Sequence, residues 1–229
     1  MMSTAVKIIS DGVIKFDGGS MFGQIPKMAW ENSVVTDRKN RMTLGLNCML
    51  LQVSGRNVLV DTGVGSKDAE NDKENLGLVP SRLLKGLKGY GLTPKDIHAV
   101  ILTHLHFDHS GGCTKLNRSG ESVPIFPKAR HIVQRACWEE AVKPNERFRN
   151  TYFQEDFLPL QEKGLLESVP SEIEALDKAK KYLETCSYRE VAEWLHRKTG
   201  RYISHVGLRK RINSSTATKA EEESQDESQ

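Results

Sequence analysis

No long hydrophobic run occurs in this sequence. Its 229 residues nowhere approach the ~20 consecutive apolar residues that a membrane-spanning helix needs. Residues 1–19 also lack the basic start and the apolar core of a signal peptide. These absences exclude a membrane partner, and we expect a soluble protein of the cytoplasm.

Cysteines are few, and neither sign of charge is in large excess. The four cysteines form no C-x-x-C pair, which argues against a disulfide framework or a cysteine-rich zinc site and predicts four free thiols: Cys48, Cys113, Cys137 and Cys186. The formal net charge of +3 by itself says little about partners. Hydrophobic residues make up 38% of the chain, which is enough for a packed core in most of it.

Up to about residue 135, the sequence shows short strands punctuated by turns. Apolar runs bounded by turn residues predict strands over 42–53, 57–60, 99–103 and 129–133. The helical spacing of Leu83, Leu84 and Leu87 predicts a helix that opens at Pro80. A second helix is expected over 135–143.

The densest set of metal-ligand residue types follows the strand that ends at Thr103. It comprises His104, His106, Asp108 and His109, within six residues. Residues two apart in an extended segment point the same way, so the first two histidines can bind one ion and the last two residues a second. A single histidine in a strand is usually structural, but three with an aspartate, followed by Gly-Gly, predict a metal site. These ligands suit zinc, expected as one or two ions, and also iron, manganese or nickel.

The run THLHFDHSGG, residues 103–112, resembles the H-x-H-x-D-H signature of the metallo-β-lactamase superfamily. The segment VLVDTG, residues 58–63, is similar to that superfamily's first motif, in which the aspartate, here Asp61, orients the site histidines by hydrogen bonds. Further segments resemble the branch that includes quorum-quenching N-acyl-homoserine lactonases: Phe16–Gly23, Pro26, Trp30, Phe126–Ala129, Trp138, Asn145 and Tyr152. The resemblance covers residues 7–167.

This resemblance implies an α/β fold, the αββα sandwich, with residues 1–167 forming its first half. It also implies a metal-dependent hydrolase in which activated water attacks an ester, lactone or amide carbonyl of a small-molecule substrate. A metal ion lowers the pKa of bound water from 15.7 to roughly 7. In such an enzyme Asp108 would be both a ligand and the catalytic proton carrier, His104 and His106 would bind one metal, and His109 the other.

The second half of the superfamily's pattern is not recognisable in this chain. That pattern requires a third histidine, a bridging aspartate and a final histidine downstream, whereas the only later histidines are His131, His196 and His205, none in a suitable setting. We therefore expect an incomplete sandwich, no tight pair of ions, and weak or no hydrolysis by this chain. The missing half would leave apolar sheet surface uncovered, which predicts self-association.

After Glu167 the sequence pattern changes. Residues 168–171 indicate a break, and residues 168–212 predict a small all-α unit of three helices. Gly200 is expected to end the second helix and Ser204 to cap the third. The apolar positions are Ile173, Leu176, Ala179 and Leu183, then Val191, Trp194 and Leu195, then Ile203, Val206 and Ile212. Residues 213–229 predict a disordered acidic tail.

Residues 188–212 resemble a helix-turn-helix, with a recognition helix at 204–212. Arg201, Arg209, Lys210 and Arg211 occur between residues 201 and 212 without any acidic residue. Phosphate contact by these residues makes DNA an alternative partner. An ordinary helical bundle with a solvated basic face would explain the same charges.

The change near Glu167 resembles a junction between two unrelated sequences. A frameshift, a gene fusion or an assembly error would each produce it. Three hypotheses follow: a metal-dependent hydrolase or its remnant, a DNA-binding protein that carries a hydrolase fragment as a passenger, and an inactive truncated product.

Overall fold

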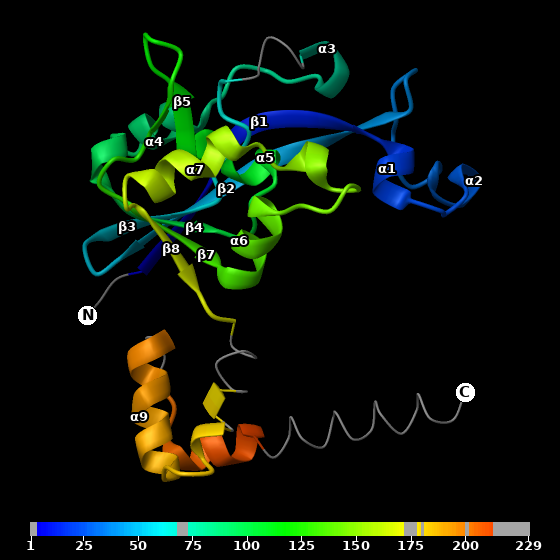
Figure 1. Cartoon of the computed structure of the whole chain (residues 1–229). Coiled ribbons are helices and arrows are strands. Elements are labelled where there is room, and N and C mark those ends of the chain that lie inside the picture. Colours follow the sequence, from blue (N-terminus) through cyan, green and yellow to red (C-terminus); the bar gives the residue numbers. More distant parts are fainter. Residues whose placement is uncertain (1–3, 68–72, 172–177, 180, 200–201, 213–229) are drawn as a thin grey trace, which may run out of the picture. The chain divides into compact units, whose positions relative to one another are not determined.

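The structure, a computed structural model, describes residues 4–67, 73–171, 178–179, 181–199 and 202–212 (Figure 1). The chain divides into two compact units, Met1–Ser168 and Val169–Gln229. The first unit contains the sheet and the metal-binding run. The second contains the helical segment.

A six-stranded mixed sheet forms the centre of the first unit. In spatial order its strands are β1 (Thr4–Asp17), β2 (Arg41–Val53), β3 (Arg56–Val60), β4 (Ile97–Leu102), β7 (Arg130–Gln134) and β8 (Leu166–Val169). The pairs β1–β2 and β2–β3 are antiparallel, whereas β3–β4 and β4–β7 are parallel. The carboxyl ends of β3 and β4 therefore meet at one edge of the sheet. A separate two-stranded sheet pairs β5 (Thr114–Leu116) with β6 (Ser122–Pro124).

The helices of the first unit are short. They are α1 (Gly18–Phe22), α2 (Lys27–Trp30), α3 (Lys73–Leu76), α4 (Leu83–Gly89), α5 (Phe107–Ser110), α6 (Arg135–Val142) and α7 (Gln154–Glu162), with 3-10 turns η1 (Pro94–Asp96), η2 (Gly111–Cys113) and η3 (Arg149–Thr151). Helices α1 and α2 lie at one end of the long β1–β2 pair, away from α4 (Figure 1).

The main core lies on one face of the sheet. Side chains of the central strands, such as Leu50, Leu59 and Val100, pack in one cluster with Leu87 of α4 and Phe157 of α7. All five are fully buried. Since successive residues of a strand point to opposite faces, the neighbouring positions of these strands form the other face.

That other face is also apolar. Ile8, Met49, Val60, Ile101 and Ile132 pair in register across β1, β2, β3, β4 and β7. The side chain of Ile8 is 60% exposed and that of Ile101 is 38% exposed. Parallel strands normally have both faces covered, so an apolar face this open is unusual.

The predicted strands are confirmed by β2, β3, β4 and β7, and the predicted helices by α4 and α6. Of the three leucines whose spacing predicted this helix, Leu83 and Leu87 are buried in the core, whereas Leu84 is 41% exposed. The break expected over residues 168–171 overlaps the end of β8 at Val169, and the two compact units divide between Ser168 and Val169. The four cysteines are free, as predicted.

The second unit has its own small core around α9 (Tyr188–Thr199) and a helix at 205–212. The core consists of Ala179, Val191, Ala192, Leu195, Leu208 and Ile212. Ser204 caps the last helix as predicted, because its Oγ accepts a hydrogen bond from the Gly207 amide at 3.1 Å. Val206, expected inside, is 53% exposed, and Leu208 occupies the inner position instead.

Three predictions about the second unit lie outside the described residues: the start of its first helix at 172–177, the end of a helix at Gly200, and the acidic tail at 213–229. Within the described part of the chain, no helix has the length and apolar character needed to cross a membrane.

Candidate metal centre

The candidate site lies where β3 and β4 end. The chain leaves β4 after Leu102, and it is still extended at His106, where φ is −62° and ψ is 148°. Helix α5 then begins at Phe107. The first two histidines of the run therefore come from the segment between β4 and α5, and Asp108 comes from the first turn of α5.

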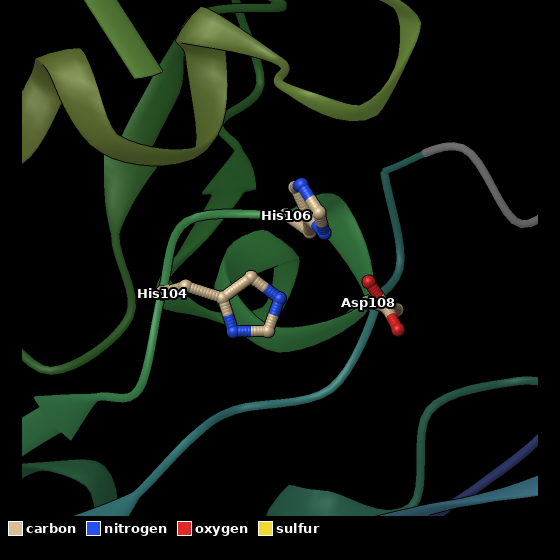
Figure 2. A group of neighbouring side chains, drawn as sticks. All are labelled: His104, His106 and Asp108. Carbon is tan, nitrogen blue, oxygen red and sulfur yellow. The ribbon is translucent and has the colours of Figure 1, made fainter. Parts of the chain in front are cut away.

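His104, His106 and Asp108 form a group that could hold a metal ion. One ligand atom from each lies within 4.8 Å of the others, and all three side chains are half-buried. Figure 2 shows the three side chains around a common space. Imidazole nitrogen and carboxylate oxygen bind zinc at about 2.0–2.2 Å, so this donor set suits that ion.

His109 lies beside this group but is not part of it. Its ring centroid is 4.0 Å from that of His104, and its Nε2 is 3.4 Å from Oδ2 of Asp108. Its Nδ1 lies 2.8 Å from Oδ2 of Asp61. The contact with Asp61 occupies Nδ1 and leaves Nε2 on the side of Asp108.

Asp61 also anchors the segment that carries the histidines. Its carboxylate accepts hydrogen bonds from the amide and hydroxyl of Thr103 at 2.9 and 3.0 Å. Asp61 has a φ of 56°, in the left-handed region that aspartate and asparagine tolerate better than most residues. The hydroxyl of Thr103 also lies 3.1 Å from Nδ1 of His104. Thr103 therefore connects Asp61 to the ligands, a role that no sequence motif indicates.

The protonation states of the histidines suit a cation. Burial lowers the pKa of His104, with a further decrease from the neighbouring histidines, and burial also lowers the pKa of His106. Burial lowers the pKa of His109 as well, but its hydrogen bond to Asp61 and the charge of Asp108 outweigh this, so that its pKa is raised. His104 and His106 are thus neutral near pH 7 and keep a lone pair for a metal.

A cavity of about 650 Å³ opens over the ligands. Besides the ligand residues, its lining includes an apolar wall made of Ile14, Phe16, Leu44, Leu46 and Phe107. A wider hollow of about 810 Å³ between β1 and α4 contains none of the ligands. The candidate ligands therefore line the smaller of the two cavities.

The three histidines that follow His109 in the sequence lie apart from this group. His131 is buried in the interior, and His196 and His205 belong to the second unit. In the part of the chain that the structure describes, none of them joins a metal-ligand group.

The basic residues of the predicted recognition helix are partly described. Arg209, Lys210 and Arg211 are exposed on the helix at 205–212, and Arg201 lies outside the described residues. Exposed basic residues fit a solvated helix as well as DNA contact. DNA binding stays a prediction.

Residues 43–200 match the family model described as the metallo-beta-lactamase superfamily. Because this match covers more than half of the chain, the chain belongs to the metallo-β-lactamase superfamily. The resemblance and the α/β fold class predicted from the sequence are thereby confirmed. The match continues past Glu167 and includes α9.

Three known proteins show how far the similarity extends. An N-acyl homoserine lactonase of Bacillus cereus is 32% identical over 139 residues, which are 56% of this chain and 49% of that protein. A probable metal-dependent hydrolase from Staphylococcus aureus has a TM-score of 0.65 and 33% identity, over 73% of this chain and 59% of the other. The dizinc quorum-quenching lactonase AidC, with a TM-score of 0.56 and 18% identity over 74% of this chain and 59% of the other, shows the fold alone.

This chain thus spans about half the length of the curated relative and about three fifths of the solved structures. The match to the family model, residues 43–200, contains β3, β4, β7, β8, most of β2 and the ligand run. The rest of each relative lies outside the match.

Proposed function

We propose that this chain is a metal-dependent hydrolase of small molecules with an ester or lactone carbonyl. The observation that carries the proposal is the convergence of His104, His106 and Asp108 within 4.8 Å at the base of a cavity. The superfamily membership supports it. The B. cereus relative, named as a lactonase, favours the lactone class.

Zinc is the proposed cofactor, as one or two ions, and iron, manganese or nickel fit the same ligands. When bound, such an ion would supply a water nucleophile at neutral pH and polarise the carbonyl of the substrate. His104 and His106 would hold one ion, with Asp108 as a further ligand. His109 would present Nε2 to a second ion, since Asp61 occupies its Nδ1.

Asp108 is the proposed proton carrier. Its carboxylate belongs to the ligand group and lines the cavity, so it reaches both the ligands and a bound substrate. A carboxylate in this place can accept a proton from the attacking water and return it to the leaving oxygen. The apolar wall of the cavity would contact an apolar acyl group of the substrate.

Activity of this chain alone is proposed to be weak. The described residues offer one group of three ligand residues, with His109 beside it, and a bridged pair of ions normally needs more. Further ligands would be expected in the part of the relatives that lies outside the match.

Two measurements on the purified chain test this function. We expect about one zinc ion per chain by elemental analysis. We also expect slow ring opening of an N-acyl homoserine lactone, measured through the proton that the reaction releases. His106→Ala should lose both, whereas His205→Ala, an exposed histidine of the second unit, should lose neither. A chain that binds far less than one ion, or a His106→Ala variant with full activity, would overturn the proposal.

A further inference from the structure

Lys67 is a buried lysine outside the set of candidate ligands. Its side chain is 3% exposed, and its Nζ lies 2.8 Å from Oδ1 of Asp156, whose side chain is 1% exposed. Lysine is almost never fully buried unless it is paired, so this ion pair has a structural or functional cause. The pair links the loop after β3 to helix α7.

The ammonium group of Lys67 also binds one turn of the backbone. Nζ donates hydrogen bonds to the Gly111 carbonyl at 2.6 Å and to the carbonyl and hydroxyl oxygens of Thr114 at 3.1 and 2.8 Å. This turn, η2 with its following residue, directly continues α5, which carries Asp108 and His109. Carbonyls at the end of a helix lack intrahelical donors, and a cation placed there satisfies them.

The loop after β3 contacts the ligand-bearing segment at several points. The amide and hydroxyl of Thr62 donate to the His109 carbonyl at 2.8 and 2.9 Å, and the amide of Gly112 donates to the Gly63 carbonyl at 3.0 Å. A Cβ at Gly65 would lie 2.8 Å from the Gly111 carbonyl oxygen, so the two segments are in direct backbone contact. Lys67 adds the last contact of this series.

We propose that Lys67, whose positive charge is balanced by the carboxylate of Asp156, is a positioning residue for the metal site. It fixes the turn after α5, so that Asp108 and His109 keep their place relative to His104 and His106. It acts through the backbone, because its ammonium group is directed at Asp156 and at the turn. This inference rests on the proposed function, since it assigns Lys67 to the metal site which that function needs.

The main test removes both charges of the pair. The double variant Lys67→Met with Asp156→Leu leaves no unpaired charge in the interior, which single variants would. Lys15→Met is the matched control, because Lys15 of β1 forms a partly exposed ion pair with Asp37. Cobalt(II) alone is the probe, titrated into the purified full chain. We expect the double variant to bind cobalt about 10-fold to 100-fold more weakly, the range for groups that orient ligands. The cobalt absorption spectrum should change, and the control should match the wild type.

A second measurement needs no metal. Hydrogen exchange at the amides of Thr62 and Gly112 should become about 10-fold faster in the double variant, while amides of β4 keep their protection. A purely structural role would lower protection throughout the first unit instead. If the double variant does not fold, Lys67→Arg, which keeps the charge but changes the donor geometry, should weaken cobalt binding several-fold.

The outcomes separate the two proposals. Unchanged cobalt affinity, unchanged spectrum and unchanged exchange at Gly112 would overturn the role of Lys67 and leave the proposed function standing. A wild-type chain that binds no cobalt would overturn the proposed function, while the exchange measurement would still decide whether Lys67 fixes the turn.

Discussion

At the scale of single residues, the buried side chain of His131 gives the first unit a specific sensitivity to acid. His131 lies on β7 with none of its surface exposed, and burial lowers its pKa from 6.5 to about 4. Its imidazole is therefore neutral in the folded protein over most of the pH range. The unfolded chain, in contrast, takes up a proton below pH 6.5.

The free energy of unfolding should consequently decrease as the pH is lowered from 6.5 to 4. In this window only the unfolded state binds the proton, so acid favours unfolding, and the effect levels off below about pH 4. The shift corresponds to about 3 kcal/mol at ~1.4 kcal/mol per pKa unit. Urea unfolding gives the free energy of unfolding of the first unit at pH 7 and at pH 4. We expect this free energy to decrease between the two pH values by about 3 kcal/mol less in His131→Leu than in the wild type.

Other carboxylates and histidines contribute to acid unfolding in both proteins, so the measured quantity is the difference between the two pH dependences. Parallel stability curves for the wild type and His131→Leu would show that His131 does not titrate in this window.

At the scale of secondary-structure elements, a β-bulge in β1 places a carboxylate inside the protein. The register of β1 against β2 shifts between Ser10 and Gly12, and the extra residue, Asp11, is only 2% exposed. Asp11 accepts hydrogen bonds from the amide of Gly65 at 3.3 Å and from the amide of Leu83, the first residue of α4, at 3.0 Å. One side chain thus joins β1, the loop after β3 and the start of α4.

Asp11→Ala should destabilise the first unit by about 2–4 kcal/mol, because buried amides at the start of α4 and in the loop lose their acceptor. Asp11→Asn retains one oxygen acceptor and should cost less than half as much. Thermal unfolding of the three proteins checks this order. Equal losses for both variants would mean that the charge of Asp11 matters and its hydrogen-bond geometry does not.

The same bulge explains why β1 could not be predicted from the sequence. A bulge shifts the alternation of inward and outward residues by one, so TAVKIISDGVIKFD shows no continuous period of two. Strands β2, β3, β4 and β7 were predictable because their apolar runs are uninterrupted and bounded by turns. Helix α7 was missed because Pro159 lies inside it. Proline lacks an N–H, and the Glu155 carbonyl four residues earlier accepts from the hydroxyl of Thr114 at 2.8 Å instead.

The candidate site was predictable only in part, because some of its contacts join residues far apart in the sequence. The ligands lie in one short run, which a sequence motif can show. Lys67 contacts that run across 44 residues of sequence, and Asp61 contacts Thr103 across 42. Such contacts depend on β3 and β4 being parallel neighbours, which the sequence does not reveal directly. The orienting role of Asp61 was predicted only through the family resemblance, and the contacts of Thr103 and Lys67 were not predicted.

At the scale of the whole molecule, the main feature is the open apolar face of the sheet. A single exposed apolar residue is ordinary, but here five apolar residues, two exposed and three partly buried, are in register across five strands, from Ile8 of β1 to Ile132 of β7. Two sheets pack face to face about 10 Å apart when both faces are apolar.

A second copy of this chain is the partner that we predict for the open face, because two identical apolar faces can pack against each other about a twofold axis. Each copy would bury Ile8 and Ile101 of its partner along with its own. Changing both to glutamate should weaken a dimer at least about 100-fold, since each buried isoleucine contributes about 1.5–3 kcal/mol and a tenfold change costs ~1.4 kcal/mol.

Sedimentation velocity over a range of concentrations measures this association. Leu84→Glu is the matched control, because Leu84 is exposed to a similar extent as Ile101, at 41% against 38%, but lies on α4. We expect the wild type and Leu84→Glu to associate with the same affinity, and the double variant, Ile8→Glu with Ile101→Glu, to remain monomeric. A monomeric wild type would show that the apolar face is not used between copies. Association that survives in the double variant would place the contact on another surface.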